Sequence, residues 1–364
     1  MAIADSRIAG YTPTPRPREA LSDVIARQGV GFWIVVVLLL IMPALANPFW
    51  LVQIIGYAMV LGMVALSLMF LGGYGGIVSL VQMTVAAFAA YLVAIFGDSA
   101  ITQISLKWPW WTAVPVAIVL ATLFGTLSGA LSVRTEGIYT IMITLAIASA
   151  FYYLCLQNYT IFNGFSGFNG VVPPVFLGVD WGETIPFYYL VLACSALAYA
   201  AVIYVSRAPF GLALQGTRDN PRRMAALGFN VVAHRIAAYT FASVIAAFAG
   251  VLLVWYQRQV SPGTAGVGPV VDMLIIAVVG GLSRPIGPFV GALVYVLLRT
   301  FSLDVLEGLG LDGKRYQLVI GVGFLVIVLF SPDGLVGIWQ RLRERYRRNS
   351  EAKAAAMRIG GGSP

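Results

Sequence analysis

The chain alternates between long apolar runs and short polar breaks. A run of about 20 apolar residues is long enough to cross the hydrocarbon core of a bilayer as an α-helix. The pattern predicts ten membrane-spanning helices, at about residues 32–46, 51–71, 77–96, 112–133, 137–156, 186–206, 236–257, 269–282, 286–300 and 316–330. We therefore expect an all-α polytopic membrane protein.

Composition agrees with this class, and charge adds an orientation. Of the 364 residues, 59% are hydrophobic and 10% are charged, and the mean hydropathy is +0.86, far from the values of a soluble domain. With ten spans, 18 basic residues fall on the side of the two termini and five on the other side. Cytoplasmic segments carry the excess of Lys and Arg, so both termini are expected in the cytoplasm. The net charge of +8 resides in loops and tails and does not indicate nucleic-acid binding.

The expected organisation has three parts. Residues 1–29 form a cytoplasmic tail, residues 30–338 a transmembrane domain, and residues 339–364 a basic cytoplasmic tail. No small-residue cleavage site follows the first apolar run, so we expect that run to remain as a span and not to be removed as a signal peptide.

The longest polar break in the interior, residues 207–235, is the strongest candidate for a functional segment. It holds five arginines, the only histidine of the chain and Asp219 as its one acidic residue. Asp219 or Asn220 can cap a short helix that opens with Pro221 and closes at Gly228. On this helix we expect one apolar side, made by Met224, Ala225 and Leu227, and a basic side, made by Arg222 and Arg223. Two interpretations stay open: a capped loop whose arginines only fix the topology, or a docking helix that receives force from a soluble partner.

The third apolar segment, residues 77–96, has an unusual polar beginning. It follows a glycine-rich turn at residues 72–76 and contains Ser79, Gln82 and Thr84. A single polar group in a membrane helix commonly bonds to a neighbouring helix. Three such groups in half a helix favour a helix that is broken or that lines a cavity.

Little in the sequence indicates catalysis or a cofactor. The chain has one histidine, and Cys155 and Cys194 lie inside apolar segments, so we expect no metal site and no disulfide. It has no GxSxG motif and no GxxxxGK[ST] phosphate-binding loop, so ATP would have to be bound by another chain. Asp272, the one acidic residue placed within a span, lies near its predicted outer end and suits the helix dipole there. No ionisable group lies near the midplane, which argues against an ion-coupled carrier.

A series of blocks between residues 55 and 338 carries a family resemblance. In order they read RTEGIYTIMITLA (134–146), NGFSGFNGVVPP (163–174), APFGLALQGTRDNPRRMAALGFNV (208–231), ASVIAAFAGVLL (242–253), VDMLIIAVVGGLSRPIGPFVGA (271–292) and LFSPDGLVGI (329–338). These blocks resemble the permeases of bacterial branched-chain amino acid ABC importers, in particular the M-type (LivM-like) subunit. The resemblance implies an ABC importer permease fold and a multi-pass location in the bacterial inner membrane.

The resemblance also implies partners and a role for the polar loop. The partners would be a homologous second permease, two ATP-binding subunits and a periplasmic substrate-binding protein, in addition to a small-molecule substrate and membrane lipid. The polar loop would be the segment that couples the permease to an ATP-binding subunit, through Arg218, Asp219, Asn220, Arg222, Arg223, Ala226 and Gly228. Under the alternating-access mechanism that follows, candidates for the translocation path are Ser79, Gln82, Thr84, Thr140, Thr144 and Ser243. Each of these could instead be a helix-packing group.

One block departs from the family pattern. Where the family tends to read SLGHAAFFGIGAY, residues 79–91 read SLVQMTVAAFAAY, with Gln82 in place of the usual polar ring and Val81 in place of glycine. If this helix lines the path, the substrate preference is shifted. Urea, short amides and other amino acids therefore stay open beside leucine, isoleucine and valine. The alternative from a different class is a stand-alone ion-coupled secondary carrier.

Overall fold

The computed structural model describes residues 30–308 except 102, 136 and 177, together with residues 321, 322, 334, 335 and 337. It divides into two units, residues 1–46 and 47–364. The described part of the first unit is one helix, α2 (Val30–Leu45), which matches the first predicted span. The predicted tails at 1–29 and 339–364 lie outside the described residues, as does most of the tenth predicted span.

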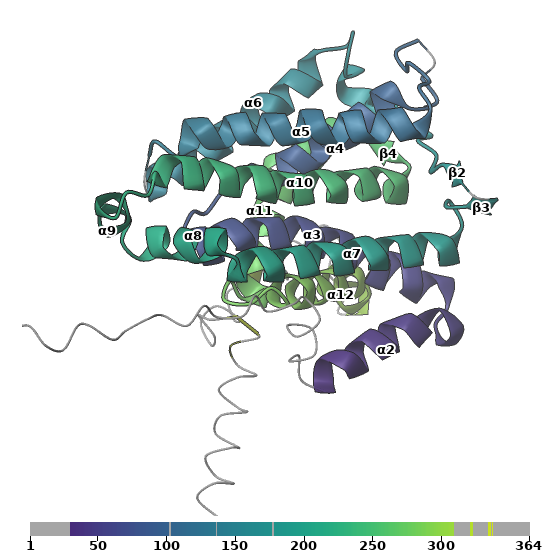
Figure 1. Ribbon diagram of the computed structural model, residues 1–364. Helices are drawn as coiled ribbons and strands as arrows, with labels where there is room; N and C mark the ends of the chain where they lie inside the picture. The colour runs from purple at the N-terminus through teal and green to yellow at the C-terminus, as the bar shows by residue number, and fades with distance from the viewer. Residues whose placement is uncertain are drawn as a thin grey trace, which may run out of the picture. The chain divides into compact units, whose positions relative to one another are not determined.

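The described part of the second unit is mostly helical (Figure 1). It begins with one continuous helical segment formed by η1 (Phe49–Gly56), α3 (Tyr57–Met69) and η2 (Phe70–Tyr74). The helices that follow are α4 (Gln82–Phe96), α5 (Trp110–Ser132), α6 (Ile138–Gln157), α7 (Thr184–Arg207), α8 (Pro209–Asp219), α9 (Pro221–Ala226), α10 (Val231–Gln257), α11 (Val267–Gly280) and α12 (Gly287–Gly308).

Five of the described helical segments are long and apolar enough to cross a membrane. They cover residues 49–74, 110–132, 138–157, 184–207 and 231–257. The second unit is therefore a polytopic helical membrane protein. The total of ten spans and the orientation of the termini stay predictions.

Helix α4 lies at the centre of one group of helices, with α5 and α10 packed against it (Figure 1). Small residues make this packing close. A Cβ atom added to Gly129 would lie 2.4 Å from the Tyr239 ring, and one added to Gly125 would lie 2.1 Å from the hydroxyl oxygen of Ser243. The buried small residues of α5 recur every fourth position, at Ala113, Ala117, Ala121, Gly125 and Gly129. Such spacing lets membrane helices approach closely and gain van der Waals contact.

The second group of helices surrounds α3, in which every residue except Tyr57 is buried. Helices α10, α11, α12 and α7 contact it. The break predicted at residues 283–285 is present as a tight turn between α11 and α12, and there Gly281 has a φ of +104°. In the same hairpin a Cβ atom on Gly291 would lie 2.1 Å from the carbonyl oxygen of Ile276, so only glycine allows this approach.

The third predicted span is wrong in its first part. Residues 77–80 are not helical, and α4 begins only at Gln82. The Leu80 N–H donates to the hydroxyl of Thr144 at 3.2 Å and so does not join a helical ladder. With 15 residues, α4 is about 22 Å long, which is less than the hydrocarbon thickness of a bilayer. The predicted span 77–96 is therefore broken at its polar beginning, as expected, and only its second part forms the helix α4.

Three other predicted boundaries are corrected by the fold. The turn expected at residues 72–76 occurs at Gly75 and Gly76, because the preceding helix continues to Tyr74. The seventh span, expected from residue 236, begins at Val231, because the Asn230 side chain caps it by accepting from the Ala233 N–H at 3.0 Å. The outer loop expected from residue 302 begins later, because α12 continues to Gly308.

The connections on the predicted outer side are structured. Strand β1 (Phe168–Asn169) pairs antiparallel with β4 (Gln259–Val260), with Phe168 opposite Val260. Strands β2 (Val175–Phe176) and β3 (Val179–Asp180) form a second antiparallel pair. Two short 3-10 helices, η3 (Gly164–Ser166) and η4 (Pro262–Ala265), complete these connections.

Candidate functional site

The predicted short helix of the polar loop is confirmed as α9, and Asn220 is its cap. The Asn220 side-chain oxygen accepts a hydrogen bond from the Arg223 N–H at 2.9 Å, and Pro221 occupies the first helical position. At the other end, the N–H groups of Gly228 and Phe229 donate to the carbonyls of Ala225 and Met224. Gly228 has a φ of +89°, which a Schellman-type helix end requires. Both ends of α9 are thus capped by hydrogen bonds between residues of the helix and those directly next to it in the sequence.

A second helix in this loop, α8, was not predicted. It covers the first part of the polar break and ends at Asp219, whose carboxylate pairs with Arg218 at 3.0 Å. Asp219 therefore binds its neighbour, and the capping of α9 falls to Asn220. Helix α9 packs on α8 through Met224, since a Cβ atom on Gly216 would lie 2.8 Å from the Met224 sulfur.

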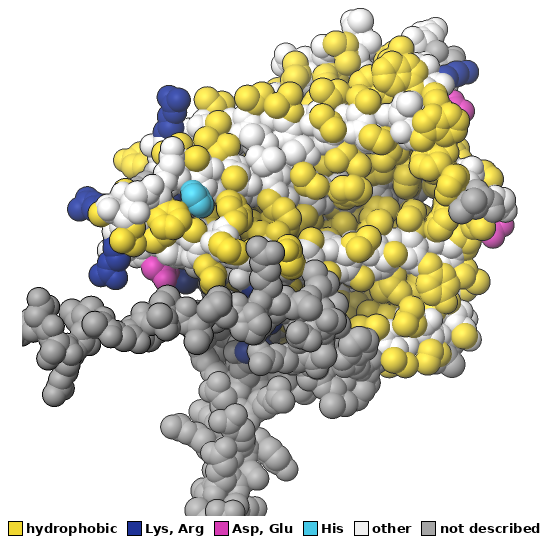
Figure 2. Space-filling model, in the orientation of Figure 1, with side chains coloured by type: hydrophobic (Ala, Val, Ile, Leu, Met, Phe, Trp, Pro, Cys, Tyr) yellow, Lys and Arg dark blue, Asp and Glu magenta, His cyan; other side chains and the backbone are white. Residues whose placement is uncertain are grey.

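The surface of α9 is open, and none of its residues is buried. The exposed residues include the predicted coupling residues Arg222, Arg223, Ala226 and Gly228. Of the expected apolar side, Met224 packs on α8, whereas Ala225 is exposed and Leu227 is 68% exposed. Figure 2 shows basic side chains gathered at the end of the molecule where α8 and α9 lie, next to a largely hydrophobic surface over α5, α7 and α10. Arginines beside an exposed leucine form a surface suited to an acidic, partly apolar protein partner.

The single histidine has a structural environment. His234 lies in the first turn of α10, where its Nδ1 is 3.0 Å from the carbonyl oxygen of Asn230. Its ring stacks on Phe210 of α8 at a centroid distance of 5.8 Å and meets Phe229 edge-on. These contacts connect the beginning of α10 to α8.

Arg218 connects the polar loop to the end of the helical segment formed by η1, α3 and η2. Its guanidinium donates a hydrogen bond to the carbonyl oxygen of Gly73, at the end of η2. Its side chain also packs over Gly76, where an added Cβ atom would lie 2.5 Å from the Arg218 Cγ. This contact reaches the turn that precedes the broken helix α4. A bond from an arginine to a backbone carbonyl carries no sequence signature, so sequence reasoning missed it.

The six predicted path residues are all buried inside the subunit: Ser79, Gln82, Thr84, Thr140, Thr144 and Ser243. Several lie around the irregular beginning of α4. Gln82 accepts a hydrogen bond from Ser67 at 3.3 Å, and Thr144 holds the Leu80 N–H. The Tyr239 hydroxyl lies near the hydroxyls of Ser79 and Ser132.

The remaining path candidates sit in helix contacts. Thr140 donates to the Thr135 carbonyl at 2.9 Å, and Ser243 faces Gly125 of α5. Thr84 is fully buried in α4. Thr140 and Thr144 thus bond within the subunit, whereas the buried hydroxyls of Ser79, Thr84 and Ser243 have no hydrogen-bond partner among the described residues. A role of these residues in the path stays a proposal.

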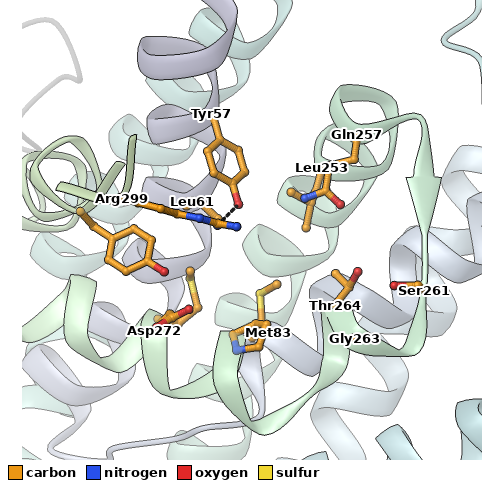
Figure 3. A pocket seen from close by; sticks show the side chains of 13 residues that line it. Tyr57, Leu61, Met83, Leu253, Gln257, Ser261, Gly263, Thr264, Asp272 and Arg299 are labelled. Atoms are coloured by element: carbon orange, nitrogen blue, oxygen red, sulfur yellow. Dashed lines mark hydrogen bonds between the residues drawn. The ribbon is translucent and has the colours of Figure 1, made fainter. Parts of the chain in front are cut away.

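A polar cavity of about 210 Å³ lies where α3, α10, α11 and α12 meet (Figure 3). Arg299 of α12 donates to the hydroxyl of Tyr57 at 3.3 Å, and Tyr295 of α12 and Asp272 of α11 line the same cavity. The sequence suggested a dipole role for Asp272, but nothing in it indicated that Asp272 and Arg299 share a cavity. They lie on different helices, and their meeting depends on the tight α11–α12 turn.

Comparison with known proteins identifies the family. Residues 50–329, well over half of the chain, match the family model described as branched-chain amino acid transport system / permease component. The chain is 24% identical over 249 residues to the high-affinity branched-chain amino acid transport system permease protein LivM of Escherichia coli, covering 62% of this chain and 57% of LivM. It is 26% identical over 236 residues to the probable LivM of Methanocaldococcus jannaschii, covering 61% of this chain and 67% of that protein.

The chain is also similar to a permease that is named for a different substrate. The chain is 22% identical over 255 residues to the ribose import permease protein RbsC of Haemophilus influenzae, covering 68% of this chain and 75% of RbsC. No solved structure matches the chain. The match over residues 50–329 and the similarity to LivM proteins show that the chain belongs to the branched-chain amino acid transport permease family, as a LivM-like permease of the ABC transporter type.

Proposed function

We propose that this chain is a transmembrane subunit of an ATP-driven importer for branched-chain or related amino acids in the bacterial inner membrane. In this proposal it forms the translocation path with a homologous second permease, and a periplasmic binding protein delivers the substrate. Two ATP-binding subunits hydrolyse ATP, and one of them docks on residues 219–228. The observation that carries the proposal is helix α9, which is capped at both ends and has no buried residue, with Arg222 and Arg223 exposed.

The contacts of α8 suggest how force on α9 reaches the membrane helices. Met224 transmits movement of α9 to α8, because it packs directly on Gly216. Helix α8 then acts through Arg218 on the carbonyl of Gly73 and on the Gly76 turn. Beyond this turn lies the irregular stretch before α4, where few helical hydrogen bonds resist a change in direction. Closure of the ATPases would thus reorient α4 and its buried polar residues.

Branched-chain amino acids are the favoured substrates because the family model and the LivM relatives carry that description. The similarity to a permease named for ribose shows that sequence similarity of this degree extends beyond amino acid transport. Substrate selection would rest largely with the binding protein. Urea and short amides are the competing substrates within the same mechanism.

The decisive experiment is purification of the chain from its native membrane with identification of the proteins that accompany it. We expect to find two ATP-binding subunits and a second permease in the purified complex. Proteoliposomes that contain this complex should take up radiolabelled leucine only when ATP is present on the side of the membrane that carries the ATP-binding subunits. Purification of the chain alone, with ATP-independent uptake driven by an ion gradient, would show that it is a secondary carrier and that the proposal is wrong.

A further inference from the structure

The cavity between α3, α10, α11 and α12 brings three kinds of recognition group together (Figure 3). Asp272 contributes a carboxylate from α11, and Arg299 contributes a guanidinium from α12. The apolar side chains of Leu61, Met83 and Leu253 line the same space. An anion, a cation and a hydrocarbon surface in one cavity match a molecule that carries a cationic group, an anionic group and an aliphatic part.

Aromatic residues lie beside both charged groups. Tyr295, only 6% exposed, lines the cavity together with Asp272, and Tyr57 accepts the hydrogen bond from Arg299. Tyr57 is itself fixed by stacking on Tyr256, with ring centroids 4.9 Å apart and an interplanar angle of 14°. Charged groups that are positioned before binding lose little conformational entropy when a ligand arrives.

The cavity has room for more than a single water molecule, and charged, polar and apolar side chains share its wall. Its volume of about 210 Å³ is many times the roughly 10–15 Å³ of cavity space that one water molecule needs. Charged side chains among membrane helices are costly and usually serve a substrate pathway or pair with each other. An ion pair that only joins α11 to α12 would explain the charges but not the space and the apolar wall beside them.

We propose that this cavity binds a zwitterionic aliphatic α-amino acid, with Arg299 on its carboxylate, Asp272 on its ammonium group and the apolar side chains around its hydrocarbon part. The inference rests on the proposed transport function and assigns to it a substrate site within this subunit. Ser261 and Thr264, on the connection between α10 and α11, line the cavity and offer hydroxyl groups to the same ligand (Figure 3).

The test uses the full chain in membrane nanodiscs with its co-purified partners. A single cysteine is introduced as Thr264→Cys in a chain that also carries Cys155→Ala and Cys194→Ala. The rate at which a charged thiol reagent modifies this cysteine is then measured with L-leucine, with 4-methylpentanoate, which lacks the ammonium group, and with leucine methyl ester, which lacks the carboxylate. At a leucine concentration ten times the Kd we expect modification to slow by about tenfold. The two analogues, at the same concentration, should protect far less.

Charge-neutralising variants test the assignment of each group. Asp272→Asn and Arg299→Gln should each weaken protection by leucine by roughly tenfold to hundredfold. In addition, Asp272→Asn should remove the preference for leucine over 4-methylpentanoate, and Arg299→Gln should remove the preference over the methyl ester. A purely structural ion pair would not produce this crossed pattern. Asp98→Asn is the matched control, because Asp98 is exposed and does not line the cavity.

The possible outcomes distinguish failure of the cavity proposal from failure of the proposed transport function. If leucine uptake depends on ATP but Thr264→Cys is modified equally fast with and without leucine, the cavity proposal is wrong and the proposed function stands. If leucine protects selectively but no ATP-driven uptake is found, the cavity proposal stands and the proposed function falls. Protection by all three compounds alike would show an unselective apolar cavity and would overturn the zwitterion assignment.

Discussion

The guanidinium of Arg218 donates a hydrogen bond to the carbonyl oxygen of Gly73, a residue 145 positions earlier in the chain. One end of this bond lies in the polar loop that carries α9, and the other lies at the end of a membrane helix, just before the broken helix α4. Arg218 also pairs with Asp219, which fixes its side chain beside the beginning of α9. This relationship gives the polar loop a direct physical connection to the membrane helices.

We expect Arg218→Gln to lower ATP-driven uptake by roughly tenfold or more, because it replaces a charge-assisted hydrogen bond. The surface of α9 is untouched, so the ATP-binding subunits should still co-purify. Uptake and the amount of bound ATPase are measured on the same preparation. Arg258→Gln is the control, since Arg258 donates to the Gly182 carbonyl at 2.9 Å away from the polar loop. Equal uptake by both variants would rule out a coupling role for Arg218.

We expect the double variant Arg222→Glu, Arg223→Glu to insert normally but to lose its ATP-binding subunits. Both side chains are exposed on α9, so reversing their charge changes a docking surface without disturbing the core. Insertion is checked by the yield of the purified chain, and docking by quantifying the ATPase in the purified complex. The variant Arg222→Lys, Arg223→Lys keeps the charge and should retain most of the binding. Normal uptake by the charge-reversed chain would contradict docking at α9.

Gly228→Ala tests the end of α9 through the backbone alone. A Cβ atom at this position meets nothing within 4 Å, but the φ of +89° is strained for any residue except glycine, at a cost of about 1–2 kcal/mol. We expect faster amide hydrogen exchange across residues 221–228 and weaker binding of the ATPase. Gly268→Ala also places its Cβ in open space, without a positive φ, and should change neither quantity. Gly228→Pro, which also removes the N–H that bonds to Ala225, should have the larger effect.

Gly129→Ala tests the close packing of α5 on α10. The added methyl group would overlap the Tyr239 ring, and overpacking of this kind costs typically about 1–3 kcal/mol. We therefore expect a lower thermal unfolding temperature for the purified chain. Val119→Leu adds one methylene to the same helix where Val119 is 64% exposed, and it should leave that temperature unchanged. If both variants unfold at the same temperature as the unaltered chain, α5 and α10 do not pack as described.

Local signals accounted for much of the candidate site. Asn220, Pro221 and Gly228 predicted α9 because a cap, a first-turn proline and a closing glycine act within a few residues of one another. The same kind of signal at Asn230 was overlooked, and so α10 began earlier than expected. Helix α8 was missed because its polar face resembles a loop when the neighbouring helices are unknown.

The sequence by itself determined the membrane class, most of the long spans and the capped helix of the polar loop. These follow from hydrophobic length, backbone hydrogen bonding and capping, all of which are decided within about one helix. Only the tertiary structure decided that Leu80 bonds to Thr144, that Arg218 reaches Gly73, and that Asp272 and Arg299 share a cavity. Such contacts join residues far apart in the chain, and they depend on how closely small residues such as Gly125 and Gly291 let the helices approach.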